Sequence, residues 1–565
     1  MRRRTFLGVS AGSLGAAFGQ TGGQASGQRD DSEVLYLQKK RGKHSFRATP
    51  GRRPNIFLIS ADMVSPDHYH PSRELHRHMR LPALQSLRDD AVEFSNAFAG
   101  CPLCAPARAM MMTGRYTYIT ANGERAHDGH ETVLRPDDVI FPEYLKAIGY
   151  TNRHCGKGHL GVAKFIDGFD ENVDAWDRWA PPIYDDEGYL AYLRGMGVKP
   201  QRYRKELFGL EPDRKTPRAA LGGWITQADG APFPLEAQYT RYLIEQAIQK
   251  IDAARDAGTG SPIYLQLDLF DPHQPFSIPS GLEDREKELS AAFGLPETYK
   301  DVTTRDWRPA PGEPKVYDFY RRSWGLYDGA TVKSYRVANA LQMEVIDRSI
   351  ARFLQALKER GLYDESVIIF CADHGEMNGR HALVDKGVYL YPDVLRIPLV
   401  IKMPKSYGIK RHRVEAPVSQ LDLAPTLLSL TGVAPQERFD GQSLLGYLDE
   451  SKSPVDRELL FECGWHTGVN FACAVQRWKS SGEHHLYTYN ASAFEDELYD
   501  LNALEARNLA PNPQFKTIRQ EMIARMGRLL RNDPRWIGYW HSFRVDHYWN
   551  LPREKAGDYQ MFRPQ

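Results

Sequence analysis

Apolar, β-branched runs alternate with amphipathic segments along most of the chain. Four of these runs are short and nearly continuous, as expected for strands that are buried on both faces of a sheet. They are Asn55–Ala61, Ile263–Leu269, Ser366–Ala372 and residues 398–403. Apolar residues at helical spacing occur in residues 81–91, 141–148, 236–254 and 338–359. The alternation predicts an α/β domain with helices around a mostly parallel central sheet.

Two later regions have a different pattern. Residues 169–231 are rich in Trp, Tyr, Pro and Gly and lack a clear period, which indicates an insertion over one face of the sheet. After residue 453 the apolar runs shorten and alternate, at 458–462, 469–476 and 484–489, and a helical segment follows at 513–531. This pattern predicts a smaller C-terminal α+β domain, with an antiparallel sheet and a packed helix. We therefore place a catalytic domain at residues 54–453 and the smaller domain at 454–565.

Residues 536–549 are crowded with Trp, Tyr, Phe and His. Packing of these aromatic side chains against the main domain is the favoured interpretation, and a wall for stacking sugars is the alternative.

Charge excludes some classes of partner. The 565 residues carry 73 Lys and Arg against 72 Asp and Glu, so the net charge of +1 gives no reason to expect nucleic acid. The densest basic stretch, residues 39–53, is interpreted as part of a solvated linker over 29–53. The six cysteines are too few and too scattered for a disulfide scaffold, and the pair Cys101 and Cys104 lacks the further ligands of a zinc site.

The N-terminus has the features of an export signal. Arg3-Arg4-Thr5-Phe6-Leu7 precedes a Gly/Ala-rich run over residues 8–18, which resembles a twin-arginine signal peptide within residues 1–28. A disordered basic N-terminus is the alternative. No later segment offers roughly 20 consecutive apolar residues, so we expect no stable membrane insertion and a periplasmic or extracellular location.

Residues suited to metal binding and acid–base chemistry follow three of the predicted strands. Asp62 follows the first strand, His273 lies just beyond the second, and Asp373-His374 follows the third. One acid at a strand end is commonly a turn former. Three such endings predict a site, because ligands of open α/β sheets bind outside the carboxyl ends of the strands.

A nucleophile motif joins these residues: Cys104-Ala-Pro106-Ala-Arg108, continued by Thr-Gly-Arg at 113–115. The form C-x-P-x-R followed by T-G-R resembles the sulfatase signature. Cys101 is out of register, because residues 103 and 105 are Leu and Ala where Pro and Arg would be needed. Pro106 suits the first turn of a helix, which would place Cys104 at the positive end of that helix, where an anionic sulfate is stabilised.

Further landmarks occur in the order found in this family over most of residues 54–510. They are Gly156-Lys157-Gly158-His159-Leu160-Gly161, Pro272-His273-Gln274-Pro275-Phe276, Asp373-His374-Gly375-Glu376 with Gly379, His381 and Lys386, residues 418–430, and Glu497-Leu498-Tyr499-Asp500-Leu501. The chain is identified as a member of the formylglycine-dependent type I sulfatases. The resemblance implies an alkaline phosphatase-like fold and hydrolysis of sulfate esters of an organic substrate, either a carbohydrate or an aryl compound.

The resemblance also implies a modified cysteine and a metal. Cys104 would be oxidised to formylglycine by a formylglycine-generating maturation enzyme, and one hydroxyl of the aldehyde hydrate would attack sulfur. Asp62, Asp373 and His374 would bind one divalent metal together with the modified Cys104. Ca²⁺ is the first expectation, with Mn²⁺ and Mg²⁺ as alternatives.

The other candidate residues carry positive charge or transfer protons. By resemblance, Arg108 and Lys157 would hold the formylglycine and the sulfate. His159 would accept the hydroxyl proton when sulfate is eliminated, and Lys386 and His273 would stabilise or protonate the leaving oxygen. In an extended segment, residues 157 and 159 would point to the same face.

Two departures leave alternatives open. Met63 stands where many sulfatases carry a second carboxylate, and His374 stands where others carry Asn. Both features resemble the branch that includes choline sulfatases and phosphonate monoester hydrolases. A phosphonate or phosphate ester hydrolase is therefore the main alternative function. A non-catalytic protein that binds sulfated glycans is the second.

Overall fold

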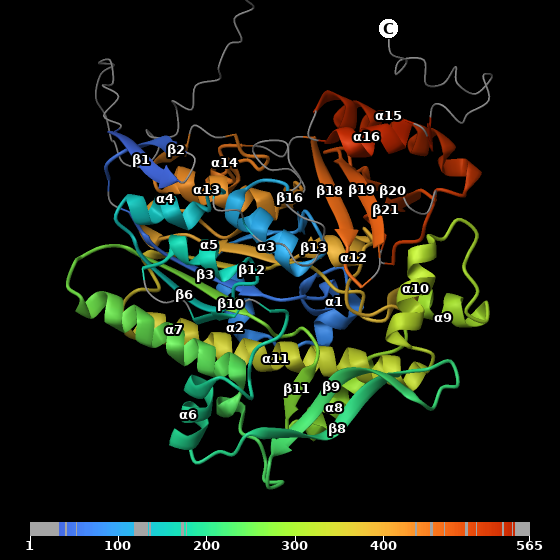
Figure 1. Ribbon diagram of the computed structural model, residues 1–565, viewed down its shortest axis with the longest axis horizontal. Coiled ribbons are helices and arrows are strands. Elements are labelled where there is room, and N and C mark those ends of the chain that lie inside the picture. The colour runs from blue at the N-terminus through green and yellow to red at the C-terminus, as the bar shows by residue number, and fades with distance from the viewer. Residues whose placement is uncertain are drawn as a thin grey trace, which may run out of the picture.

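The computed structural model describes residues 33–547 except 40–41, 52, 118–133, 135–136, 171–173, 177, 436–437, 453–455, 468, 492–494, 504, 534–535 and 545. The predicted export signal lies outside the described residues. The main body of the protein is a helix–sheet–helix sandwich, and a second sheet packs at one side of it (Figure 1).

The central sheet has the strand order β15-β4-β14-β12-β3-β10-β6-β7. Its strands are β3 (Asn55–Ala61), β4 (Val92–Phe94), β6 (Thr151–Lys157), β7 (Asp174–Trp176), β10 (Ile263–Leu269), β12 (Ser366–Ala372), β14 (Leu399–Lys402) and β15 (His412–Val414). The five strands from β12 to β7 are all parallel, whereas β14 pairs antiparallel with both of its neighbours. The predicted α/β fold with a mostly parallel sheet is confirmed.

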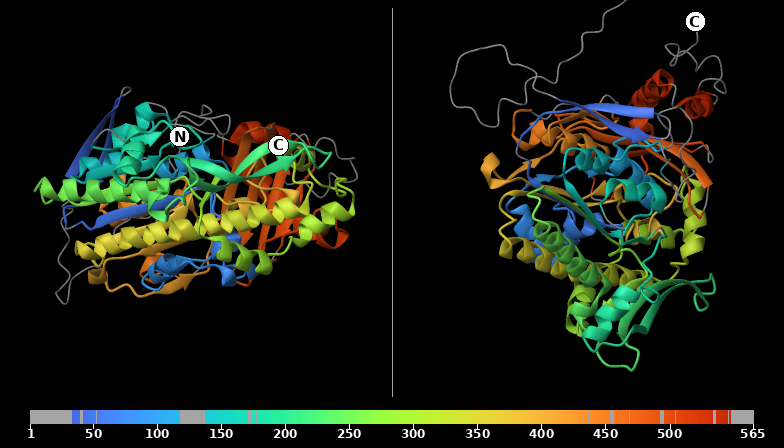
Figure 2. Two further views of the ribbon diagram at one scale, coloured as in Figure 1. Left: turned by 90° about the horizontal axis from the view of Figure 1, so that it is seen from below. Right: turned by 60° about the vertical axis from the view of Figure 1, so that its left-hand side comes forward.

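Helices cover both faces of this sheet. On one face lie α2 (Pro82–Arg88), α7 (Tyr239–Asp256) and α11 (Gly329–Glu359), and on the other lie α3 (Cys104–Thr113), α4 (Phe141–Ala147) and α13 (Leu423–Leu430). Figure 2 shows α7 and α11 running along the molecule when it is seen from below. The helix α11 begins nine residues before the predicted start at 338. Asp328 caps it by accepting hydrogen bonds from the backbone N–H groups of Ala330 and Thr331.

The predicted linker over residues 29–53 contains two strands in its described part. Residues Glu33–Lys39 form β1 and Gly42–Ala48 form β2, which pair with β17 (Val433–Pro435) in a three-stranded sheet. The ring of Phe46 is buried 5.1 Å from that of Tyr144. The high content of basic residues led to the prediction of a linker, but the apolar side chains of the strand β2 pack inward.

The predicted insertion is only partly an insertion. It contributes β7 to the edge of the central sheet, and then forms α6 (Glu187–Gly195) and the strands β8 (Gln201–Leu210) and β9 (Pro217–Gln227). These two strands join β11 (Phe276–Pro279) in a small sheet that projects from the main body, on the side away from the C-terminal helices (Figure 2).

The C-terminal region matches its prediction. An antiparallel sheet of β18 (Arg457–Trp465), β19 (Val469–Trp478), β20 (His484–Asn490) and β21 (Glu497–Asp500) packs against α15 (Lys516–Asn532) and α16 (Ile537–Arg544). Most described aromatic residues after position 535 are buried in the same core as this sheet, which supports the packing interpretation of the aromatic stretch. They are Trp536, Tyr539, Trp540 and Phe543.

The remaining elements are short or peripheral. They include α1 (Pro66–Tyr69), α5 (Val162–Phe165), α8 (Glu283–Ala292), α9 (Glu297–Thr304), α10 (Lys315–Trp324), α12 (Pro392–Leu395), α14 (Leu445–Leu448), β5 (Ala97–Phe98), β13 (Arg396–Ile397) and β16 (Val418–Ser419). Among the described helices, none is both long and apolar enough to cross a bilayer.

Candidate active site

The carboxyl ends of three parallel strands meet at one edge of the central sheet, as predicted. Asp62 follows β3 and Asp373 follows β12, and both side chains are fully buried. The backbone N–H of Asp62 donates to the carbonyl of Leu269 at the end of β10 (3.1 Å), and that of Asp373 donates to the carbonyl of Ala61 (3.2 Å). These hydrogen bonds extend the pairing by one residue past the ends of β3 and β12, and they fix the two carboxylates beside each other.

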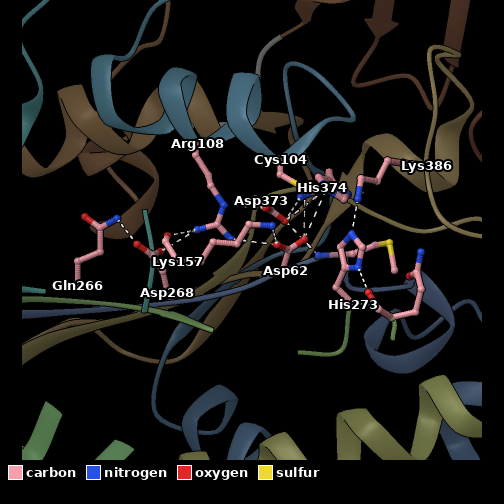
Figure 3. Close-up of polar contacts among 12 residues, drawn as sticks. Asp62, Cys104, Arg108, Lys157, Gln266, Asp268, His273, Asp373, His374 and Lys386 are labelled. Atoms are coloured by element: carbon pink, nitrogen blue, oxygen red, sulfur yellow. Dashed lines mark hydrogen bonds and ion pairs between the residues drawn. The ribbon is translucent and has the colours of Figure 1, made fainter. Parts of the chain in front are cut away.

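Cys104 faces these carboxylates from the opposite side. It is the first residue of α3, preceded by Leu103 in an extended conformation, and Pro106 lies in the first turn as predicted. The Sγ atom of Cys104 lies 3.3 Å from Nε2 of His374 and 3.7 Å from Oδ1 of Asp62 (Figure 3). The residue is buried at the N-terminal end of a helix, where the helix dipole favours negative charge.

Four side chains form a cluster able to hold a metal ion. One ligand atom from each of Asp62, Cys104, Asp373 and His374 lies within 4.8 Å of the others. Burial and the nearby Asp62 raise the pKa of Asp373, and a cation would relieve this repulsion. Carboxylate oxygens suit Ca²⁺, Mn²⁺ or Mg²⁺, the nitrogen ligand of His374 makes manganese or magnesium more competitive with calcium, and a thiolate suits softer ions. An oxygen-bearing residue at position 104 would complete a hard donor set, so the cluster fits the predicted metal and modification.

Two cations hold the outer side of the cluster. The Nζ atom of Lys157 donates to Oδ2 of Asp62 (2.5 Å), and Nε of Arg108 donates to Oδ2 of Asp373 (3.0 Å). Arg108 also donates to Asp62 (3.4 Å) and to the carbonyl of Lys157 (2.9 Å). Burial and Cys104 raise the pKa of Asp62, but nearby cations, Lys157 foremost, outweigh them and lower it to about 2. Asp62 is therefore ionised at neutral pH.

Lys386 and His273 form a second pair beside Cys104 (Figure 3). The Nζ atom of Lys386 contacts Nε2 of His273, and Nδ1 of His273 contacts the carbonyl oxygen of Gln274. A ring nitrogen that faces a carbonyl oxygen must donate, and an ammonium can only donate, so Nε2 of His273 accepts the hydrogen bond from Lys386. Burial lowers the pKa of Lys386, but Asp385 at 3.2 Å and Cys104 outweigh it and raise the pKa, so Lys386 stays charged.

The backbone at His159 is not extended, although an extended segment was predicted here. The strand β6 ends at Lys157, and His159 has a left-handed backbone with φ 54°. The alternation of side chains along an extended segment therefore does not set its direction. Its side chain is buried, and its backbone N–H donates to the carbonyl of Trp176 (3.3 Å). Its role in proton transfer stays a prediction.

Met63 takes part in the site through its backbone. Its N–H donates to Oδ1 of Asp373 (3.0 Å), and its side chain is buried with the backbone in the left-handed region, at φ 60°. The site thus lacks the charge that a carboxylate at this position would add, but residue 63 still fixes one oxygen of Asp373.

Sequence reasoning missed a third buried carboxylate, Asp268 within β10. Its Oδ1 lies 3.5 Å from a terminal nitrogen of Arg108, while Oδ2 accepts from Nε2 of Gln266 (2.7 Å) and lies 2.9 Å from Nε2 of His154. Asp268 therefore supports the guanidinium from behind (Figure 3). The signal was present, because a charged residue inside a strand predicted to be buried on both faces needs a partner.

Gln420 was also missed. Its Nε2 donates to the backbone carbonyl of Asp373 (3.2 Å), and its Oε1 accepts from the N–H of Gly100 (3.0 Å). It thereby ties the segment before α3 to the end of β12. It is the first residue of the short 3₁₀ helix Gln420–Asp422 after β16, within the landmark 418–430, but no feature of the sequence singled out this glutamine.

Comparisons with known proteins agree with this geometry. The family model "Sulfatase" matches residues 54–433, and "N-sulphoglucosamine sulphohydrolase, C-terminal" matches residues 379–532. The uncharacterized sulfatase YidJ of Escherichia coli (strain K12) is 26% identical over 449 residues, covering 78% of this chain and 80% of its own. The choline-sulfatase of Rhizobium meliloti (strain 1021) is 26% identical over 488 residues, covering 82% and 83%.

Solved structures support the fold. The phosphonate monoester hydrolase SpPMH from Silicibacter pomeroyi superposes with a TM-score of 0.64 at 21% identity, covering 86% of this chain and 97% of that one. The family match spans well over half of the sequence, and its relatives are named as sulfatases. The chain belongs to the sulfatase family and is a hydrolase that acts on sulfate esters.

Proposed function

We propose that this protein hydrolyses sulfate esters of an organic substrate through a formylglycine formed from Cys104. The observation that carries this proposal is the position of Cys104, buried at the start of α3 with its Sγ atom among Asp62, Asp373 and His374. A maturation enzyme that generates formylglycine would be the partner that modifies the residue.

A divalent metal would be held by Asp62, Asp373, His374 and the modified residue 104. Ca²⁺ is our first choice, with Mn²⁺ and Mg²⁺ as alternatives. When bound, the metal supplies positive charge opposite the oxygens of the sulfate group.

The first chemical step transfers the sulfate group to residue 104. One hydroxyl of its aldehyde hydrate forms a bond to sulfur and releases its proton to solvent, while the bond from sulfur to the ester oxygen breaks and its electron pair stays on that oxygen. Arg108 and Lys157 are fixed cations on the outer side of the cluster and would stabilise the charge on the sulfate oxygens. The charged Lys386, in contact with His273, would supply positive charge or a proton to the leaving oxygen.

The second step releases sulfate without an attack of water on sulfur. His159 would accept the proton of the remaining hydroxyl, the carbon–oxygen bond to sulfate would break, and the aldehyde would form again. Water then restores the hydrate.

Peptide mass spectrometry of active protein from the native host would test the proposal. We expect residue 104 to have the mass of formylglycine, and release of inorganic sulfate to scale with the converted fraction. Fully active protein with an unaltered thiol at residue 104 would refute it.

A phosphonate or phosphate ester hydrolase is the second candidate function. It rests on Met63, which replaces a carboxylate, and on His374 in the metal set, because both features resemble the branch that contains such enzymes. Rates on an aryl sulfate, a phosphate diester and a phosphonate ester should be compared for one preparation. A preference for the phosphorus esters would favour this candidate. A purely binding function has less support, since Lys386, His273 and the nucleophile motif are all present.

We also propose export through the twin-arginine route, on the basis of the paired arginines and the small-residue tract at the N-terminus. Fractionation of the native host should find the protein outside the cytoplasm, and Arg3→Lys with Arg4→Lys should retain it inside. An unchanged distribution of that double variant would contradict the proposal.

A further inference from the structure

An exposed tryptophan lies at the same edge of the sheet as the candidate active site. The strand β7 pairs in parallel with β6, with Trp176 opposite Lys157. Trp179 follows three residues later, so it emerges beside the end of the strand that carries Lys157. Its ring centroid lies 6.1 Å from that of His273 and 6.4 Å from that of Phe270.

Trp179 is the outer member of a group of three aromatic rings. Phe270 and His273 stack at 5.1 Å with an angle of 26° between their planes, and the Nζ atom of Lys157 lies 5.5 Å from the centre of the Phe270 ring. Phe270 and His273 are only 5% and 3% exposed, whereas Trp179 is 49% exposed. Tryptophan is usually largely buried, so an exposed indole beside the buried ring of His273 is a candidate platform for a ligand.

The position of Trp179 relative to the chemistry indicates which part of the substrate it would meet. Sulfur would lie at residue 104, and the leaving oxygen would lie toward Lys386 and His273. Trp179 is the exposed member of the group of rings around His273. The organic group attached to the leaving oxygen would therefore lie against the indole.

The Lys386–His273 pair indicates the class of leaving group. A phenolate leaves readily, because the pKa of a phenol is about 10, and needs little help from an acid. An alkoxide resembles hydroxide, which is a far stronger base than a phenolate, and needs a proton or a close cation as the bond breaks. A buried ammonium in contact with an imidazole at this point suits an alcohol as the leaving group.

We propose that Trp179 is a specificity-determining residue that stacks on the apolar C–H face of a pyranose ring, whose hydroxyl carries the scissile sulfate. A pyranose is an alcohol at the leaving oxygen and presents a flat apolar face, so it meets both requirements. This inference rests on the proposed function and narrows its substrate to sulfated sugars.

Steady-state kinetics of three full-length variants, each with formylglycine verified at residue 104, would test the inference. The variants are Trp179→Ala, Trp179→Phe and Tyr184→Ala. Tyr184 is a matched control, because it is an aromatic residue of the same segment with a similar exposure of 53%. The substrates are a pyranose monosaccharide sulfate, propyl sulfate and nitrophenyl sulfate.

We expect Trp179→Ala to lower kcat/KM for the sugar sulfate about tenfold, mainly by raising KM, because one aromatic stacking contact is lost. Trp179→Phe should keep part of the activity, and Tyr184→Ala should stay within about twofold of wild type. Propyl sulfate has the same kind of leaving oxygen but no ring, so its kcat/KM should change less than twofold in all variants. An unchanged melting temperature would show that the variants are folded.

Two results would overturn the inference while leaving the proposed function intact. One is an unchanged kcat/KM of Trp179→Ala on the sugar sulfate. The other is a wild-type preference for nitrophenyl sulfate with the effect of Trp179→Ala confined to that substrate, which would assign the platform to aryl esters. Modified wild-type protein that releases sulfate from none of the three substrates would overturn the proposed function itself, and this inference with it.

Discussion

Two buried carboxylate clusters lie a few residues apart in the chain and differ in how their oxygens are used. In the candidate active site, Asp62 Oδ2 accepts from Lys157 and Arg108, while Oδ1 lies 3.7 Å from both Cys104 Sγ and His374 Nε2. One oxygen is therefore held by fixed cations, and the other faces the potential metal ligands.

The second cluster surrounds Asp67, on the helix α1 that follows Asp62. Both of its oxygens accept from Arg380, at 2.7 and 2.9 Å, and Oδ2 also accepts from Asn378 (2.8 Å) and Arg336 (3.3 Å). Asp393 completes this cluster by pairing with Arg73 and with Arg380. Every oxygen of Asp67 is thus occupied by the protein's own donors.

The comparison separates a structural cluster from a reactive one. A buried carboxylate that is saturated by arginine and amide donors has no capacity left for a ligand, so the Asp67 cluster positions the chain. It ties α1 to residues 378–393, the segment that carries Lys386. Gly375, just after β12, packs against the backbone of Asp393, where a Cβ atom would lie 1.9 Å from the carbonyl oxygen. The Asp62 cluster keeps one face open to chemistry, at the cost of repulsion between its carboxylates.

The largest effect should come from the nucleophile. Cys104→Ala should lower turnover at least about 10⁴-fold, because no other group can form the covalent intermediate, and melting should change little. Cys101→Ala is the matched control, since it is also buried but lies outside the motif register. Release of sulfate and thermal melting should be measured for both. Equal activity of the two variants would remove Cys104 from the mechanism.

The second largest effect should come from metal removal, which should affect the Asp62 cluster but not the Asp67 cluster. A chelator should abolish activity, and added Ca²⁺, Mn²⁺ or Mg²⁺ should restore it and raise the melting temperature by binding the native state. Asp62→Asn should lose this metal-dependent rise. Asp67→Asn should keep it, because Asp67 has no oxygen free for a metal. A rise that is lost only in Asp67→Asn would reverse our assignment of the clusters.

Asp67→Asn should instead destabilise the fold by about 3–5 kcal/mol, since Arg380 and Arg336 would stay buried without their carboxylate. Denaturant unfolding measures the difference in free energy of unfolding. Asp284→Asn, at an exposed position, serves as the control and should leave the free energy unchanged. A value for Asp67→Asn equal to the control would mean that the cluster does not hold the fold together.

Removal of the support behind Arg108 should have a moderate effect. Asp268→Asn keeps the shape of the side chain but removes the charge beside the guanidinium, so we expect kcat to fall about tenfold, with KM less affected. The kinetics should be compared with those of Asp284→Asn, the same change at an exposed position. Wild-type kcat in Asp268→Asn would show that Lys157, Asp62 and Asp373 suffice to position Arg108.

Lowering the pH should reduce the free energy of unfolding gradually, because it protonates Asp67. Burial raises the pKa of Asp67, but Arg380, Arg336 and Arg73 outweigh it and hold the pKa well below 3.8. The stabilisation is therefore complete above about pH 4 and is lost as pH falls below that value, by up to ~1.4 kcal/mol per pH unit for this group. Denaturant unfolding between pH 2.5 and 6 should show that Asp67→Asn lacks this contribution. Parallel pH profiles of variant and wild type would contradict it.

Local sequence determined much of the fold and of the nucleophile's setting. Three predicted strands match β3, β10 and β12 to the residue, and α3 begins at Cys104. This is expected, because periodicity and first-turn residues act within a few positions of the chain. The grouping of Asp62, Asp373 and His374 was also accessible, since parallel strands align their carboxyl ends, whereas Cys104 was added to it through the family resemblance.

Tertiary structure alone decided the pairings between distant segments. Neither the strand β2 within a basic stretch nor the short edge strand β7 has a strong period of its own, and each forms because a neighbouring strand supplies its hydrogen bonds. The contacts of Asp268 with Arg108, Asp67 with Arg380 and Trp179 with His273 join residues that lie about 90 to 310 positions apart. Local sequence patterns cannot predict such contacts, because the partners come close only when the sheet edge and its loops have packed.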